Sequence, residues 1–176
     1  TGVQTCALPI LSAIISDTVL FRSPTCTETD KEMAHKLAAI AGVDIESYGL
    51  EMLKAGADIS DLTNDEIVRT DMKEFSEAGQ TISIGQISVM DTTDVLAKQA
   101  ELVAALEALR IANGYAASYI MVTNILDEST TLIYSGDVES VVVNAFGKDV
   151  KDNAVFLPNT MSRKKQIVPP ILGAMK

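Results

Sequence analysis

The sequence predicts an α/β fold, because three features of the chain agree on it. Strand-like and helix-like apolar patterns alternate along the second part of the chain, which is typical of a sheet covered by helices. A stretch of small and polar residues at 55–61 separates this part from a shorter helical region, as a hinge between domains does. An apolar fraction of 47% over 176 residues supports a buried core. We therefore expect an α/β sheet domain after a boundary at 55–61, and a shorter helical region before that boundary.

The region before the hinge has helix patterns with capping signals. Residues 11–15 form an apolar run that fits either the end of a buried helix or a strand, because periodicity does not separate the two at this length. Thr27 or Thr29 can cap a helix over residues 30–41. A second short helix is expected at residues 45–54.

The region after the hinge alternates between the two kinds of pattern. Apolar residues at every second position predict strands, and helical stripes that stop at a glycine predict helices. Asp91 or Thr92 is expected to cap the long helix of this region. The expected elements are a short helix or turn at 63–66, strands at 81–89, 119–126, 131–134 and 154–157, helices at 92–112 and 138–146, and a tail from Pro169.

Charge and composition exclude several classes of protein. The net charge of −10 argues against nucleic-acid binding, which usually needs a basic face. No apolar run approaches the roughly 20 residues that span a bilayer, so we expect no membrane association and a cytoplasmic location. Cys6, Cys26 and the single histidine, His35, match no zinc or disulfide pattern. The chain therefore offers carboxylates and cations for chemistry.

The first ten residues differ in kind from the rest of the chain. Residues 2–10 match, codon by codon, the translation of a common short-read sequencing adapter. We therefore expect residues 1–10 to be a non-native, adapter-derived segment, which is left out of the fold prediction. The natural reading frame is then expected to extend upstream of this chain.

The densest basic cluster in this acidic chain is Arg163-Lys164-Lys165, between Ser162 and Gln166. A guanidinium fork that grips two oxygens, next to ammonium groups that neutralise charge, suits a polyphosphate ligand. The alternative is an ordinary solvated turn, because basic triplets are common on protein surfaces.

Two further residues have both a functional and an ordinary interpretation. Asp17 follows an apolar run and could be a hard oxygen ligand for manganese or magnesium, or a simple turn or cap residue. Lys73 is by default a surface lysine.

Five motifs, in this order along the chain, closely resemble the family II inorganic pyrophosphatases of the DHH phosphoesterase superfamily. The resemblance runs from Leu11 to the end of the chain, and an ordered set is more specific than any single motif. The motifs lie at 11–18, 21–25, 40–44, 48–58 and 162–166.

The resemblance implies a fold, an activity and a set of site residues. The chain would hold the end of the DHH-type α/β catalytic domain at residues 11–57, followed by the smaller, mixed-sheet α/β substrate-binding domain, the DHH-associated domain, at residues 58–176. The intact enzyme would hydrolyse pyrophosphate to two orthophosphates with a hydroxide activated by two or more manganese ions, for which magnesium or cobalt could substitute. The implied metal ligand is Asp17, the implied phosphate ligands are Lys73, Arg163 and Lys164, and Lys165 and Ser162 belong to the same motif.

The resemblance also carries expectations about assembly and about this chain by itself. Family members usually form homodimers through the N-terminal domain, most of which is outside this chain. The chain supplies no catalytic residue beyond its metal and substrate ligands, so by itself it should be inactive. Two alternatives remain: another DHH phosphoesterase that acts on short polyphosphates or nucleotides, and, for this chain alone, an anion-binding module.

Overall fold

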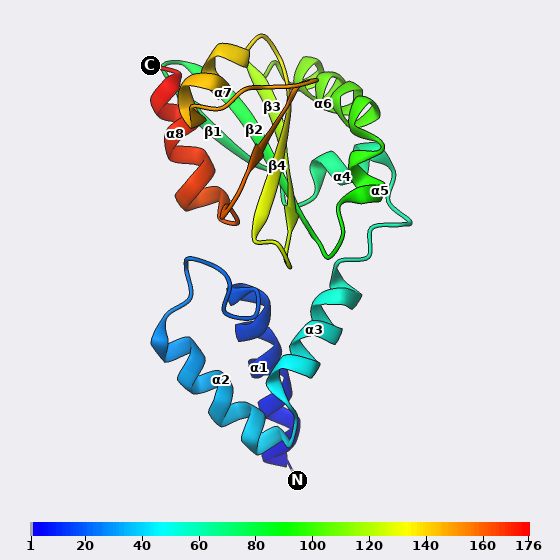
Figure 1. Cartoon of the computed structure of the whole chain (residues 1–176), viewed down its shortest axis with the longest axis vertical. Helices are drawn as coiled ribbons and strands as arrows, with labels where there is room; N and C mark the ends of the chain where they lie inside the picture. Colours follow the sequence, from blue (N-terminus) through cyan, green and yellow to red (C-terminus); the bar gives the residue numbers. More distant parts are fainter. Residues whose placement is uncertain (1) are drawn as a thin grey trace. The chain divides into compact units, whose positions relative to one another are not determined.

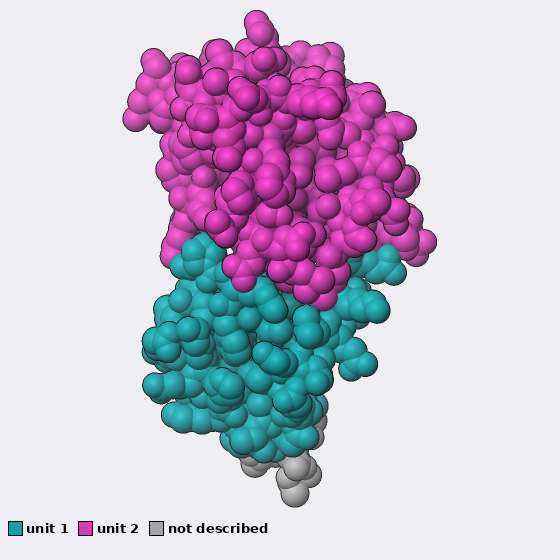
Figure 2. All heavy atoms as spheres, in the orientation of Figure 1, with its two compact units in different colours: residues 1–58 teal, residues 59–176 magenta. Residues whose placement is uncertain are grey.

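The computed structural model describes residues 2–176, with side chains from Cys6 onward, so Thr1 of the expected adapter segment lies outside the described residues. The chain divides into two compact units, unit 1 at residues 1–58 and unit 2 at residues 59–176 (Figures 1 and 2). Each unit has its own core and is described separately below.

Unit 1 is helical over its described residues. Its helices are α1 (Gly2–Thr18), α2 (Glu28–Ala41) and α3 (Ile45–Gly56). The apolar run at 11–15 is therefore helical, and residues 2–10 continue the same helix. Thr27, not Thr29, caps α2, because its hydroxyl accepts from the Asp30 amide while the Asp30 carboxylate accepts from the Thr27 amide.

The core of unit 1 is small. Buried residues of α1 and α2 meet Leu20 in the turn after α1, and partly buried residues of α3 pack against them. Among the side chains described in this unit, from Cys6 onward, three large apolar ones are exposed: Ile10, Met33 and Ile40. Helices normally turn their apolar stripe toward a core. The exposed side chains are therefore apolar surface that the core of unit 1 does not cover.

Unit 2 is a mixed five-stranded sheet with helices on both faces (Figure 1). The strand order is β1-β2-β3-β4-β5, and β2 and β3 run parallel while the other neighbouring pairs are antiparallel. This arrangement confirms the predicted α/β mixed-sheet fold. The strands are β1 (Lys73–Glu77), β2 (Gln80–Val89), β3 (Ala117–Asn124), β4 (Ser129–Ser135) and β5 (Ala154–Leu157); the helices are α4 (Asn64–Arg69), α5 (Thr93–Leu96), α6 (Gln99–Asn113), α7 (Glu139–Phe146), the π-helix η1 (Arg163–Ile167) and α8 (Val168–Ala174).

Residues on the two faces of the sheet alternate along each strand and build two cores. On one face, Ile82, Ile84 and Tyr119 pack with residues of α7, η1 and α8. On the other face, Ile120 and Val122 pack with residues of α4, α5 and α6. The sheet is therefore covered on both sides, which explains why β3 is buried along almost its whole length.

The structure of unit 2 differs from the sequence prediction in three places. The strand β1 was not predicted, because only Phe75 interrupts its polar residues and its burial is low on both sides. The helix predicted over 92–112 is two helices, α5 and α6, with a break at 97–98 that no glycine or proline marks. The tail predicted from Pro169 is the helix α8, which accepts proline because the first helical residues have no intrahelical acceptor for their amides.

Asp91 makes the side-chain hydrogen bonds at the start of α5, the first part of the helix predicted over 92–112. Its carboxylate accepts from the amide of Thr93 at 2.8 Å and from the Thr93 hydroxyl at 2.6 Å. These hydrogen bonds lower the pKa of Asp91, the hydroxyl contact being the larger cause. Thr92 makes no side-chain cap hydrogen bond.

Gly85 allows an unusually close approach between β2 and the end of α4. A Cβ atom at this position would lie 2.6 Å from the carbonyl oxygen of Val68 and 2.9 Å from Cδ1 of Ile120. The approach lets the amide of Gln86 donate to the carbonyl of Thr70 at 3.0 Å. The turn at Thr70 and Asp71 is therefore held against the middle of the sheet.

Glu107 joins α6 to β4 through a shared carboxylate. It accepts from Arg110 Nε at 2.7 Å and from Arg110 Nη2 at 2.6 Å, and it also accepts from the hydroxyl of Ser135. The hydrogen bonds from Arg110 and then Ser135 lower the pKa of Glu107 from 4.5 to about 2. Ser135 is buried, so this carboxylate also satisfies a buried hydroxyl.

This lowered pKa predicts acid sensitivity. The unfolded chain binds a proton at Glu107 before the folded chain does, so the contribution of Glu107 to stability is present above about pH 4.5 and is lost as the pH falls towards about 2. We expect Glu107→Gln to remove this contribution. Urea unfolding of both proteins between about pH 7 and about pH 2.5 measures it, and the wild-type advantage should shrink as the pH falls. Glu101→Gln, at an exposed position of the same helix, is the control, and an advantage that is constant with pH would contradict the prediction.

None of the helices in residues 2–176 combines the length and the apolar character that crossing a bilayer requires.

Candidate phosphate-binding site

The segment at 159–166 is held in a fixed loop by the side chain of Gln166. The Gln166 Oε1 atom accepts from the amides of Met161 at 3.0 Å and Ser162 at 2.9 Å, and its Nε2 atom donates to the carbonyl of Asn159 at 2.7 Å. From the sheet, Gln86 Nε2 donates to the carbonyl of Met161 at 3.1 Å. The backbone that carries the basic cluster is therefore tied both to itself and to β2.

The basic cluster begins the π-helix η1. The hydroxyl of Ser162 accepts from the amide of Lys165 at 3.3 Å, and the amide of Gln166 donates to the carbonyl of Ser162 at 2.8 Å. Short π-helical turns occur frequently at functional sites. Here the turn places consecutive basic residues in different environments: Arg163 is buried, whereas Lys164 and Lys165 are exposed.

Arg163 lies where β1 begins, with its guanidinium only 7% exposed. Nη1 donates to the carbonyl of Ile84 at 3.0 Å and to the carbonyl of Asp71, and Nη2 donates to Asp71 Oδ2 at 2.9 Å. Ile84 is the strand partner of Lys73, so the guanidinium meets the sheet at the first residue pair of β1. A buried guanidinium with this set of acceptors is fixed in position.

Lys73 is the first residue of β1, and it lies beside the same aspartate. Its Nζ atom is 3.8 Å from Asp71 Oδ1, and both side chains are more than half exposed, at 62% and 55%. Asp71 therefore contacts Lys73 on one carboxylate oxygen and Arg163 on the other. Asp71 and Arg163 are 92 positions apart in the sequence, and only the fold brings them together.

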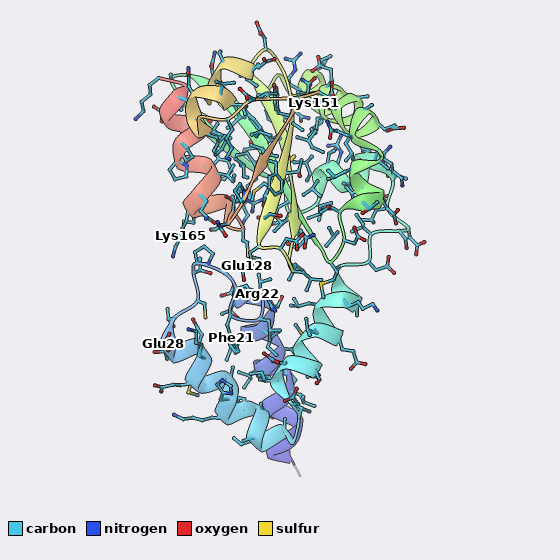
Figure 3. The ribbon with its side chains drawn as sticks, viewed as in Figure 1. Phe21, Arg22, Glu28, Glu128, Lys151 and Lys165 are labelled. Carbon is cyan, nitrogen blue, oxygen red and sulfur yellow. The ribbon has the colours of Figure 1, made fainter. Side chains whose placement is uncertain are left out.

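Lys165 lies at the end of unit 2 that also holds the turn between β3 and β4, as the labelled positions of Lys165 and Glu128 show (Figure 3). Lys151 lies at the opposite end of the same sheet (Figure 3). The side chains of Lys164 and Lys165 are exposed, and that of Ser162 is half-buried. The predicted phosphate ligands all lie in unit 2, and Asp71 links two of them, Lys73 and Arg163. The predicted residues in unit 2 are Lys73, Ser162, Arg163, Lys164 and Lys165.

Asp17 lies in unit 1, exposed on the last turn of α1. The next residue, Thr18, is buried, and its hydroxyl donates to the carbonyl of Ile14 and accepts from the amide of Phe21. Val19, Leu20 and Phe21 then have φ angles of 50°, 50° and 66°. Three successive non-glycine residues in the left-handed region are costly, so this turn has a specific, imposed conformation.

Manganese needs several hard oxygen or nitrogen ligands, and this requirement can be tested on the described residues. Asp17 has the right donor chemistry, because Mn²⁺ prefers carboxylates. Among residues 2–176, however, no three His, Cys, Asp or Glu side chains gather in a group that could hold a metal ion. The described residues therefore do not form a manganese site by themselves.

Two residues that matter to this geometry were not singled out from the sequence. Asp71 lies two positions before Lys73, and Gly85 lies inside the strand predicted at 81–89. The spacing Asp71-x-Lys73 is a weak signal, because charged pairs at this spacing are frequent on edge strands. A glycine inside a predicted strand is the stronger signal, since it often marks a close approach of another backbone.

A comparison with known families defines the class of this protein. A family model described as the DHHA2 domain matches residues 50–174. The chain therefore belongs to the DHHA2 domain family, which confirms the DHH-associated domain expected from the motifs.

Comparisons with individual proteins are more specific. The chain is similar to proteins named manganese-dependent inorganic pyrophosphatases from Staphylococcus carnosus, at 45% identity over 166 residues, and from Bacillus licheniformis, at 46% identity over 167 residues. It is also similar to the crystal structure of a Methanococcus jannaschii protein assigned to the family II inorganic pyrophosphatases, with a TM-score of 0.87 and 43% identity. These matches confirm the resemblance seen in the motifs.

The matches cover most of this chain but only part of each relative. They cover 94% and 95% of this chain and 54% of each of the two curated relatives, and 96% of this chain against 55% of the solved structure. The chain thus spans about half the length of the relatives that it matches.

Proposed function

We propose that this chain is the phosphate-binding part of an enzyme that hydrolyses inorganic pyrophosphate to two orthophosphates. The observation that carries the proposal is that Asp71 contacts both Lys73, at the start of β1, and Arg163 of η1. The residue after Arg163, Lys164, is exposed and adds a third positive charge to this part of unit 2. In a chain with a net charge of −10, such a concentration of cations favours a small polyanion. The similarity to manganese-dependent inorganic pyrophosphatases supports the same ligand.

In this proposal, each basic residue has a role that follows from its environment. Arg163 is held rigidly, so its fork would present N–H groups in a fixed direction to the phosphate oxygens. Lys73 and Lys164 are exposed on longer, flexible stems and would neutralise the charge of the substrate and of the leaving phosphate. The hydroxyl of Ser162 and the ammonium group of Lys165 would add contacts at the edge of the same loop.

The metal part of the proposed enzyme would need residues beyond this chain. Manganese ions would supply a hydroxide nucleophile and neutralise phosphate charge when bound. Asp17 would contribute one carboxylate, and the other ligands are expected in the half of the relatives that this chain does not match. We propose residues 11–57 as the end of that metal-binding domain and residues 58–176 as the substrate-binding domain.

A second function applies to this chain alone, namely that of an anion-binding module without hydrolytic activity. It is favoured by the lack of any three-residue metal-binding group among the described residues. For the longer enzyme we further propose a cytoplasmic location, a homodimer, and no binding of nucleic acid. The acidic net charge supports the last of these.

The test uses the chain by itself and in a chimera. With manganese and pyrophosphate, the 176-residue chain should release no orthophosphate, whereas a chimera that joins it to the unmatched half of the Bacillus licheniformis relative should hydrolyse pyrophosphate. Orthophosphate release measures both. A chimera that folds and binds manganese but leaves pyrophosphate intact would refute the proposed function, and faster turnover of tripolyphosphate or a nucleotide would favour another phosphoesterase.

Binding by the chain alone provides an independent measurement. Titration calorimetry with pyrophosphate should show binding that weakens by about tenfold or more in Lys164→Ala, since a charge-assisted hydrogen bond contributes about 1.5 to 3 kcal/mol. Lys148→Ala, which removes an exposed lysine from the loop after α7, is the charge-matched control and should bind as the wild type does. Equal weakening in both variants would mean that net charge, not this site, determines binding.

A further inference from the structure

Asp71 contacts two of the proposed phosphate ligands, Arg163 and Lys73. Its Oδ2 atom accepts from Arg163 Nη2 at 2.9 Å, and its Oδ1 atom lies 3.8 Å from Lys73 Nζ. Its backbone carbonyl accepts a further hydrogen bond from Arg163 Nη1. Main chain and side chain of one residue thus engage the same guanidinium.

The turn that carries Asp71 is itself held in place. The amide of Thr70 donates to Ile67 and the amide of Met72 donates to Arg69, while the carbonyl of Thr70 accepts from the amide of Gln86 in β2. Asp71 has a φ of 42°, a left-handed conformation that is accessible to aspartate, asparagine and glycine. The carboxylate is therefore projected from a fixed backbone point between α4 and β1.

The two contacts of the Asp71 carboxylate differ in what they add to stability. The ion pair with Lys73 is exposed on both sides and adds little, whereas the hydrogen bond with the buried Arg163 side chain stabilises the fold. A carboxylate beside a phosphate site also repels the phosphate, so the charge by itself lowers affinity for the ligand. The carboxylate orients the two cations, because it fixes one edge of the guanidinium fork and limits where the ammonium group of Lys73 can lie.

We propose that Asp71 is a positioning residue for polyphosphate binding, acting through Arg163 and Lys73 without touching the ligand. This inference rests on the proposed function of the site. Pre-oriented cations bind an anion better than free ones, because the ordering of their side chains has been completed before the ligand arrives. Asp71 therefore sets the geometry of the site, and the neighbouring cations supply its attraction.

The test compares two substitutions that both suit a left-handed residue. Asp71→Asn keeps a side-chain oxygen that can accept from Arg163 and removes the charge, whereas Asp71→Gly removes the side chain without straining the backbone. The probe is pyrophosphate, titrated into the 176-residue chain by calorimetry. Asp149→Asn, which removes an exposed carboxylate after α7, is the charge-matched control, and urea unfolding checks that each variant is folded.

We expect Asp71→Gly to bind pyrophosphate about tenfold or more weakly, and Asp71→Asn to stay within about threefold of the wild type. Rescue by asparagine is the outcome that a purely electrostatic role would not produce. Wild-type affinity in a folded Asp71→Gly would overturn the inference and leave the proposed function standing, as would an equal loss in both variants. No binding of pyrophosphate by the wild-type chain would count against the proposed function itself.

Discussion

Replacing Arg163 by alanine is expected to lower the free energy of unfolding of unit 2 by about 2 to 4 kcal/mol and to remove measurable pyrophosphate binding. The guanidinium donates to the carbonyls of Ile84 and Asp71 and to the Asp71 carboxylate, and it is 7% exposed. Alanine leaves these acceptors without their donor in a place that water reaches poorly. The expected loss does not reach the value for a fully buried ion pair, because the Asp71 carboxylate is half exposed and can be hydrated.

Two further variants separate the structural from the binding role of the cluster. Arg163→Lys keeps the charge but cannot reproduce the fork, so it should lose most of the same stability. Lys164→Ala removes an exposed side chain and should change the free energy of unfolding by no more than about 0.5 kcal/mol, while pyrophosphate binding falls. Urea unfolding followed by far-UV circular dichroism, and calorimetric titration, measure the two effects on the same samples.

The structure predicts that Arg163→Ala lowers the free energy of unfolding, whereas Lys164→Ala, at the next position, hardly changes it. If Arg163→Ala unfolds at the same urea concentration as the wild type, the contacts with Ile84 and Asp71 contribute no net stability and the description of Arg163 as an anchor is wrong. If Arg163→Ala is destabilised but, when still folded, binds pyrophosphate as the wild type does, Arg163 is structural only. In that case Lys73 and Lys164 would remain the proposed ligands.

Adding a single methyl group at Gly85 is expected to destabilise unit 2 by about 1 to 3 kcal/mol. The new Cβ atom would lie 2.6 Å from the backbone carbonyl oxygen of Val68 and 3.3 Å from that of Thr70. Backbone atoms cannot rotate away, so α4 must shift from the sheet, and the turn that carries Asp71 shifts with it. Gly85→Ala should therefore also weaken pyrophosphate binding.

Gly173 provides a matched control for the same chemical change. It lies in α8, is exposed, and a Cβ atom there meets nothing within 4 Å. Alanine favours a helix over glycine, so Gly173→Ala should raise the free energy of unfolding by up to about 1 kcal/mol. Urea unfolding of both variants tests the pair, and a Gly85→Ala protein as stable as Gly173→Ala would show that the close approach of α4 to β2 is not tightly packed.

Much of the fold follows from local patterns in the sequence. The strand at 154–157 has its predicted bounds, and α2 begins directly after Thr27, one of the two cap residues predicted for it. These predictions succeeded because capping and alternation depend on residues a few positions apart. The strand β1 was missed because an edge strand with polar residues on both sides has no such signature, and it exists only through its pairing with β2.

The candidate site, like the fold, was predicted from the sequence only in part. The cluster Arg163-Lys164-Lys165 predicted the ligand class, and the resemblance of the motifs along the chain predicted the family, because both depend on residue types and their order in the sequence. The sequence also predicted a domain boundary in the small and polar stretch at 55–61. The match to the DHHA2 domain confirmed the family.

Tertiary structure alone decided that Arg163 is buried against Ile84 while Lys164 is exposed, and that Asp71 joins Arg163 to Lys73. Both depend on contacts between residues far apart in the chain, made where Gly85 lets α4 approach the sheet. A sequence specifies which charges are available through their local pattern. Which of them meet is determined by the packing of sheet and helices, because a charge is oriented by whatever neighbour the fold places beside it.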